Sequence, residues 1–129
     1  MQKGFQFSTP PPIRTDFNIP IFQKTYDFCK ELYLILPNFP KRQRYTLGHQ
    51  LDNLTLEFLE LLLEANREQS EKLALLARAD SRLETLKIFL RLAKDSQSLD
   101  TKKYIHLESY LQEIGKMLGG WIKHAKQIT

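Results

Sequence analysis

Residues 73–95, LALLARADSRLETLKIFLRLAKD, decide the fold of this chain. Their apolar side chains recur at steps of three and four residues, and no proline interrupts them, which predicts a long amphipathic α-helix. Its inward face consists of Leu76, Ala79, Leu83, Leu86, Leu90 and Ala93. Outside that face lie four more apolar residues, Leu75, Ile88, Phe89 and Leu92. One four-helix bundle does not need so wide an apolar arc, and we expect further copies of the chain to cover the surplus.

Three other segments of the 129-residue chain have the same helical period. The first starts at Pro20 and ends near Leu36, the second runs from Lys41 to about Arg67, and the last follows Asp100, which suits an N-cap. The expected inward residues of the first helix are Ile21, Phe22, Tyr26, Cys29, Leu32, Tyr33 and Leu36. Valine is absent and no segment alternates with period two. These features predict an all-α, up-down-up-down four-helix bundle over residues 20–129.

Residues 1–19 differ from the rest in composition. All six prolines lie in the first forty residues, and three of them form the run from Pro10 to Pro12. This composition predicts a flexible, Pro-rich N-terminal arm. No segment has the length and apolarity of a membrane span or a secretory signal, so we expect a cytoplasmic protein with no membrane partner.

No arrangement of residues in the sequence points to catalysis. The single cysteine, Cys29, excludes an internal disulfide, and its apolar neighbours indicate a small core residue. Among the histidines His49, His106 and His124, only His49 has a carboxylate three or four residues away, Asp52, which we interpret as a solvated helix face. No Ser, His and acid set suggests a triad. We therefore expect no enzyme activity, no metal, no cofactor and no small-molecule substrate.

Charge is sorted along the chain, which has a formal net charge of +4. Residues 51–71 contain six acids and one Arg, whereas the chain from Lys87 onward has eight basic and four acidic residues. Such sorting fits a polyanion or a head-to-tail contact between copies. The residues expected to contact nucleic acid or a polymerase are Lys41, Arg42, Arg44, Arg78, Arg82 and Arg91. A solvated helix surface is the alternative interpretation of the same charges.

Glycines are unusually dense in the last helix. Gly115, Gly119 and Gly120 lie within six residues, directly before Trp121. Each glycine costs a helix interior about 1 kcal/mol relative to Ala, so the close approach of another segment should compensate. That segment belongs either to the same bundle or to a neighbouring subunit, and a slot for a ligand is the third alternative. We expect these three glycines and Trp121 to serve packing or oligomerisation.

The third and fourth helices resemble the accessory variability determinant (Avd) family of diversity-generating retroelements. The residues that carry the resemblance are Ala79-Asp80, Leu83-x-x-Leu86, Leu90-Arg91-Leu92-Ala93 and the stretch EIGKMLGGWI at 113–122. A proline break followed by Pro40-Lys41-Arg42 agrees less specifically, and the whole resemblance covers about residues 20–125. A similar family is the four-helix bundle encoded within ribosomal RNA intervening sequences, although Trp121 after the double glycine favours Avd.

The resemblance implies a function that the residues alone do not establish. It implies a homopentameric barrel that binds the reverse transcriptase of the retroelement and its template RNA, or the cDNA copied from it. Such a protein supports mutagenic cDNA synthesis and retrohoming without catalytic activity of its own. The alternative, from the similar family, is a scaffold bundle that binds no nucleic acid.

Overall fold

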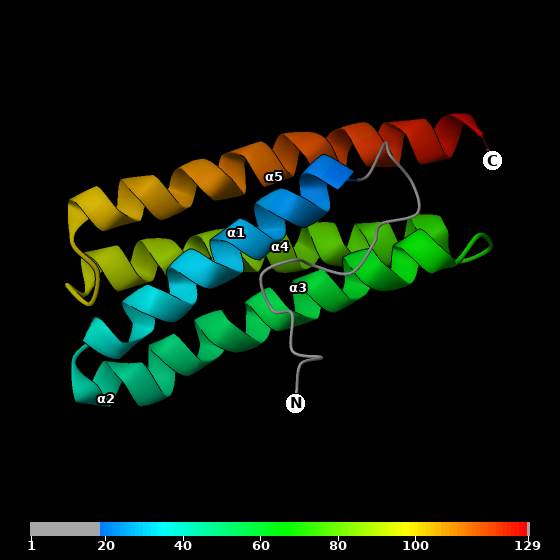
Figure 1. Cartoon of the computed structure of the whole chain (residues 1–129). Coiled ribbons are helices and arrows are strands. Elements are labelled where there is room, and N and C mark those ends of the chain that lie inside the picture. Colours follow the sequence, from blue (N-terminus) through cyan, green and yellow to red (C-terminus); the bar gives the residue numbers. More distant parts are fainter. Residues whose placement is uncertain (1–18, 129) are drawn as a thin grey trace, which may run out of the picture.

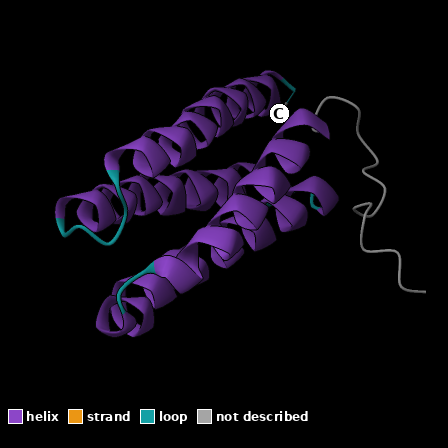
Figure 2. Ribbon diagram, turned by 60° about the vertical axis from the view of Figure 1, so that its left-hand side comes forward, coloured by secondary structure: helices purple, strands orange, loops and turns teal. Residues whose placement is uncertain are grey.

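The computed structural model describes residues 19–128, which form four long helical segments (Figure 1). The first is α1 (Ile19–Ile35), followed by a 3-10 turn, η2 (Leu36–Asn38). The second joins α2 (Lys41–Gln43), a π-helical stretch η3 (Arg44–Gly48) and α3 (His49–Arg67). The others are α4 (Lys72–Asp95) and α5 (Thr101–Gln127). Residues 19–128 contain no strand (Figure 2), so the all-α class is confirmed.

The predicted arm lies outside the described residues, except that Ile19 already belongs to α1. The predicted helix boundaries agree with the structure to within a few residues. α1 gives way to η2 directly before Pro37, which cannot donate the amide hydrogen bond of a continuing α-helix. None of the described helices combines the length and apolarity needed to span a bilayer.

The short connection between α4 and α5 caps the C-terminal end of α4 and the N-terminal end of α5. Gln97 adopts a left-handed conformation with φ of 67°, and the amide of Ser98 donates to the carbonyl of Ala93 at 2.9 Å. This is a Schellman-type end in which Gln97 occupies the position that glycine prefers. Asp100 is the N-cap of α5, as predicted, because its Oδ1 accepts the amide hydrogen of Lys103 at 2.8 Å.

α4 lies at the centre of the helix packing. It packs along α3 on one side and α5 on the other, while α1 packs along α5 and meets α3 over a smaller area. Figure 1 shows consecutive long helices running in opposite directions, with α1 crossing from beside α5 toward α2. The six predicted inward residues of α4 are all no more than 1% exposed. Their prediction is therefore confirmed.

The prediction for α1 is partly wrong. Tyr33 is 76% exposed, whereas Phe28, which was not predicted, is fully buried. The inward face of α1 is formed by Ile21, Phe22, Thr25, Phe28, Leu32 and Ile35. Leu32 is buried, whereas Tyr33, about 100° further around the helix, is exposed. Because tyrosine carries a hydroxyl, Tyr33 tolerates the outward position.

The surplus apolar arc of α4 is narrower than predicted. Leu75 is buried in the core, and Phe89 is partly buried against it. Ile88 and Leu92 remain exposed, one turn apart on the outer side of α4. Of the four residues, only Ile88 and Leu92 therefore remain as apolar residues outside the core, because Leu75 and Phe89 pack within the bundle.

Truncation of Leu83 should test the central position of α4. Leu83 is fully buried, so we expect Leu83→Ala to lower the free energy of unfolding by about 3 kcal/mol in chemical denaturation. Leu34 is the matched control, because it is 61% exposed and Leu34→Ala should change the stability by no more than about 0.5 kcal/mol. Similar losses for both variants would contradict the described core.

Candidate nucleic-acid interface

The fold gathers basic residues at one end of the bundle. Figure 1 shows that α2 and the connection from α4 to α5 lie at the same end of the bundle. Ser98 in this connection donates a hydrogen bond to Gln43 of α2. We call the following seven residues the basic end: Lys41, Arg42, Arg44, Arg91, Lys94, Lys102 and Lys103. They come from α2, η3, the last turns of α4 and the first turn of α5. Four of the six predicted contact residues belong to this set.

Two buried side chains from the connecting segments build this end. Phe39, in the proline break, and Leu99, before α5, are both almost completely buried. Gly48 fits against Phe39 and Leu36, since a Cβ added there would lie 3.4 Å from Leu36 Cδ2 and 3.7 Å from Phe39 Cδ2. The π-helical stretch therefore packs closely on the break that precedes it. Burial of Phe39 and Leu99 was not predicted, because each is an isolated apolar residue in a segment without helical periodicity.

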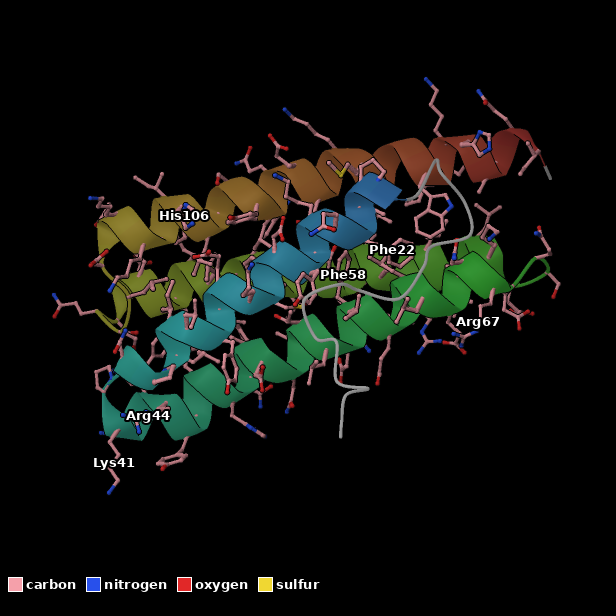
Figure 3. All side chains as sticks on the ribbon, in the orientation of Figure 1. Phe22, Lys41, Arg44, Phe58, Arg67 and His106 are labelled. Atoms are coloured by element: carbon pink, nitrogen blue, oxygen red, sulfur yellow. The ribbon has the colours of Figure 1, made fainter. Side chains whose placement is uncertain are left out.

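The basic residues of α2 and η3 have different environments. Lys41 and Arg42 are exposed, and Figure 3 shows Lys41 pointing away from the ribbon into solvent. Arg44 is partly buried, and its Nη2 donates to the carbonyl oxygen of Phe39 at 3.3 Å. Arg44 therefore ties η3 to the proline break, and its role in the structure is anchoring.

Of the other members of the basic end, Arg91 and Lys94 make local contacts. Arg91 Nε lies 3.5 Å from Asp95 Oδ2 in an exposed ion pair, which is a weak interaction in water. Lys94 Nζ lies 5.5 Å from the centre of the Tyr104 ring. The carboxylate of Asp100 accepts a backbone hydrogen bond at the start of α5. Asp95 and Asp100 thus each already have a partner, while Lys102 and Lys103 are exposed.

Arg78 and Arg82 lie in a different place. They line a shallow hollow of about 220 Å³ between α3 and α4 together with Leu61 and three glutamates, Glu57, Glu60 and Glu64. Arg82 Nε donates to Glu57 Oε1 at 2.9 Å. The structure therefore does not bring all six predicted basic residues together, and these two share their surface with carboxylates. The acidic face of α3 is paired in part within its own chain.

The glycines of α5 have little contact within the chain. A Cβ added at Gly119 or Gly120 would have no atom within 4 Å among the described residues. At Gly115 it would meet Lys87 Nζ at 3.6 Å and Leu83 Cδ2 at 3.7 Å, which is ordinary contact with side-chain ends. Close packing inside the bundle is therefore the wrong explanation for Gly119 and Gly120, because the outer side of α5 faces open space there.

Trp121 is buried at the opposite end of the bundle from the basic end. Its ring makes an edge contact with Phe22 of α1, with ring centres 6.0 Å apart. Lys72 Nζ lies 5.8 Å from the Trp121 ring and donates to the carbonyl oxygen of Ala65, near the end of α3. Burial lowers the pKa of Lys72, against an opposing effect of Glu68. Trp121 thus packs within one chain and connects the ends of three helices.

The remaining polar side chains form no catalytic or metal centre that the structure describes. Among residues 19–128, no three His, Cys, Asp or Glu side chains are grouped to bind a metal ion. His106 Nε2 lies 3.4 Å from Glu31 Oε1, and His49 Nε2 lies 3.1 Å from Asn53 Nδ2. Both are side-chain pairs at the surface of helices, and neither places a nucleophile beside a base.

Alkylation should show that Cys29 is a protected thiol. Burial raises the pKa of Cys29 from 9.0 to about 11, and the charge of Asp52 contributes to the rise. We expect iodoacetamide to modify the folded protein with a pH midpoint near 11, and the denaturant-unfolded chain with a midpoint near 9. A midpoint below that of the unfolded chain would instead identify a reactive thiolate.

The same pKa shift predicts a stability change at alkaline pH. Between pH 9 and 11 the unfolded chain loses the thiol proton while the folded chain keeps it, so the free energy of unfolding should fall as the pH rises. Cys29→Ser is the control, because it lacks this titration but retains the lysines and tyrosines. The difference in stability between wild type and Cys29→Ser should therefore change across this range.

The family comparison agrees with the extent of the helical bundle. The model of the bAvd-like family matches residues 19–125, from the first residue of α1 to the last turns of α5. No curated protein matches the chain. The family match covers most of the sequence and all four long helical segments, and it confirms the resemblance seen in the sequence. This chain belongs to the bAvd-like family.

Proposed function

We propose that the protein is a non-catalytic, cytoplasmic accessory of a diversity-generating retroelement. In this proposal it binds the reverse transcriptase and the template RNA, or its cDNA, and supports mutagenic cDNA synthesis and retrohoming. Membership of the bAvd-like family supports the accessory role. The observation that carries the nucleic-acid role is the basic end, where seven cationic residues from sequence-distant helices lie at one end of the bundle.

The basic end has exposed cations that are free to contact phosphates. Lys41, Arg42, Lys102 and Lys103 are exposed, and the two neighbouring aspartates are occupied by a backbone amide and by Arg91. Contacts of Lys and Arg with phosphates supply affinity that does not depend on base sequence. An accessory protein that accompanies a polymerase along a template needs affinity of this kind.

Arg78 and Arg82 suit a protein partner better than a polyanion. Three glutamates line the same hollow, and they would repel phosphates that approached the two arginines. A protein surface can offer charges of both signs, so we assign this hollow to the reverse transcriptase. The proposal thus places RNA at the basic end and the polymerase between α3 and α4.

Neutralising two residues of the basic end should test the RNA contact. We expect the double variant Lys41→Gln, Arg42→Gln to bind labelled single-stranded RNA more weakly in fluorescence anisotropy. The slope of log affinity against log salt should fall by about 1.4, because each lost phosphate contact accounts for about 0.7. Circular dichroism and the thermal midpoint should stay unchanged, because both side chains are exposed.

Arg78→Gln, Arg82→Gln provides the matched control, because it removes the same charge from another surface. It should leave RNA affinity nearly unchanged and weaken capture of the reverse transcriptase. Equal losses of RNA affinity in both double variants would indicate a response to net charge and contradict the assignment. A wild-type protein with no salt-dependent RNA binding would instead support the alternative, a scaffold bundle.

We further propose that the protein assembles as a homopentamer, as the family resemblance implies. Three apolar side chains on the outer sides of α4 and α5 remain exposed: Ile88, Leu92 and Ile105. The open surface at Gly119 and Gly120 offers a second place where the backbone of another copy can approach closely. A neighbouring subunit that packed there would bury the exposed apolar side chains and cover the open backbone at the two glycines.

Gly119→Leu should separate assembly from folding. A Cβ at position 119 would have no described atom of the same chain outside its own helix within 4 Å, so replacing glycine within a helix should stabilise the monomer by several tenths to about 1 kcal/mol. If another copy packs there, Gly119→Leu should also reduce the mass measured by light scattering. An unchanged mass would show that no subunit approaches this position, and Gly119→Ala controls for helix propensity alone.

A further inference from the structure

Tyr45 differs from most other tyrosines of the bundle in having an open ring. Lys30, Lys94 and Lys24 lie over the rings of Tyr26, Tyr104 and Tyr110, at 6.0, 5.5 and 5.2 Å from the ring centres. Tyr45 is 66% exposed, and within residues 19–128 no other ring or cation contacts it. Its ring is therefore available to a ligand.

The residues around Tyr45 are cationic. Lys41 and Arg42 lie four and three positions before it, so their side chains project from the preceding helical turn. Both are exposed, and both belong to the basic end. A nucleotide has a flat base and an anionic phosphate about one helical turn apart, and this stretch presents an aromatic ring and two cations with similar spacing.

The backbone holds Tyr45 in a fixed position. Tyr45 lies within the π-helical stretch η3, and π-helical turns are rare and occur frequently at functional sites. The adjacent Arg44 side chain is tied to the Phe39 carbonyl, and Thr46 Oγ1 donates to the carbonyl of Arg42 at 3.2 Å. Gly48 packs against Leu36 and Phe39 on the buried side. The ring is thus exposed on a backbone that is anchored on both sides.

We propose that Tyr45 stacks on an unpaired base of a single-stranded nucleic acid whose phosphates contact Lys41 and Arg42. Stacking on an aromatic side chain is open to every base, and it requires a base that is not already stacked within a duplex. This inference rests on the proposed nucleic-acid function and adds a preference for single strands. It gives a specific role to an aromatic side chain that helix packing does not use.

Binding of single-stranded and duplex RNA should be compared by fluorescence anisotropy at one salt concentration. The probes are a labelled oligouridine of about 12 nucleotides and a labelled duplex of the same length. Tyr45→Ala should weaken binding of the single strand about tenfold, because the base loses its stacking partner. Binding of the duplex should change by less than about twofold, since phosphate contacts dominate there.

Two variants make the comparison specific. Tyr45→Phe should retain single-strand affinity, because it keeps the ring and removes only the hydroxyl. Tyr33→Ala should also retain it, because Tyr33 is also exposed but belongs to the last turn of α1 and not to the stretch that carries Lys41 and Arg42. A weaker Tyr45→Phe would assign the effect to hydrogen bonding by the hydroxyl and overturn the stacking proposal.

The remaining outcomes separate this inference from the proposed function. If Lys41→Gln, Arg42→Gln weakens RNA binding while Tyr45→Ala does not, stacking is wrong and the proposed function stands. Equal losses of single-strand and duplex binding in Tyr45→Ala would also overturn the single-strand preference. If the wild-type protein binds neither probe at any salt concentration, both proposals fail.

Discussion

Burial of one continuous stripe on α4 is the constraint on which the structure depends. The six residues of that stripe, from Leu76 to Ala93, lose nearly all their solvent contact between α3 and α5. Apolar burial of this kind is the dominant favourable contribution to folding, whereas exposed ion pairs such as Arg91 with Asp95 contribute little. The position of α4 also determines where the connections at its two ends lie, and therefore which charges meet.

The arrangement of charge follows from this packing. Antiparallel neighbours bring the end of α4 and the start of α5 to the same end as α2, although these segments are far apart in sequence. The sequence shows that charge is sorted along the chain, but only the fold shows which basic residues become neighbours. Arg78 and Arg82 lie on the α3 side of α4 and meet carboxylates there. The same helix therefore presents cations in two different electrostatic environments.

Periodicity predicted the long helices well because their buried faces are almost entirely apolar. The phase of α1 was harder to predict, since tyrosine fits both the core and the surface, and Tyr33 was placed inside. The π-helical stretch has no signal in residue type, and it depends on packing of Gly48 against a preceding break. Gln97 occupies a left-handed position without the glycine that would mark it. The basic end required tertiary contacts that a linear pattern does not contain.

The cost of the glycines in α5 bears on assembly. Gly119 and Gly120 each destabilise the helix by about 1 kcal/mol relative to alanine, which is a large share of a typical domain stability. Within the described chain no atom approaches either position closely enough to need the missing side chain. Neither glycine adopts a positive φ, so backbone conformation does not require them. No compensating contact comes from residues 19–128, which supports our proposal that another copy of the chain approaches the outer side of α5.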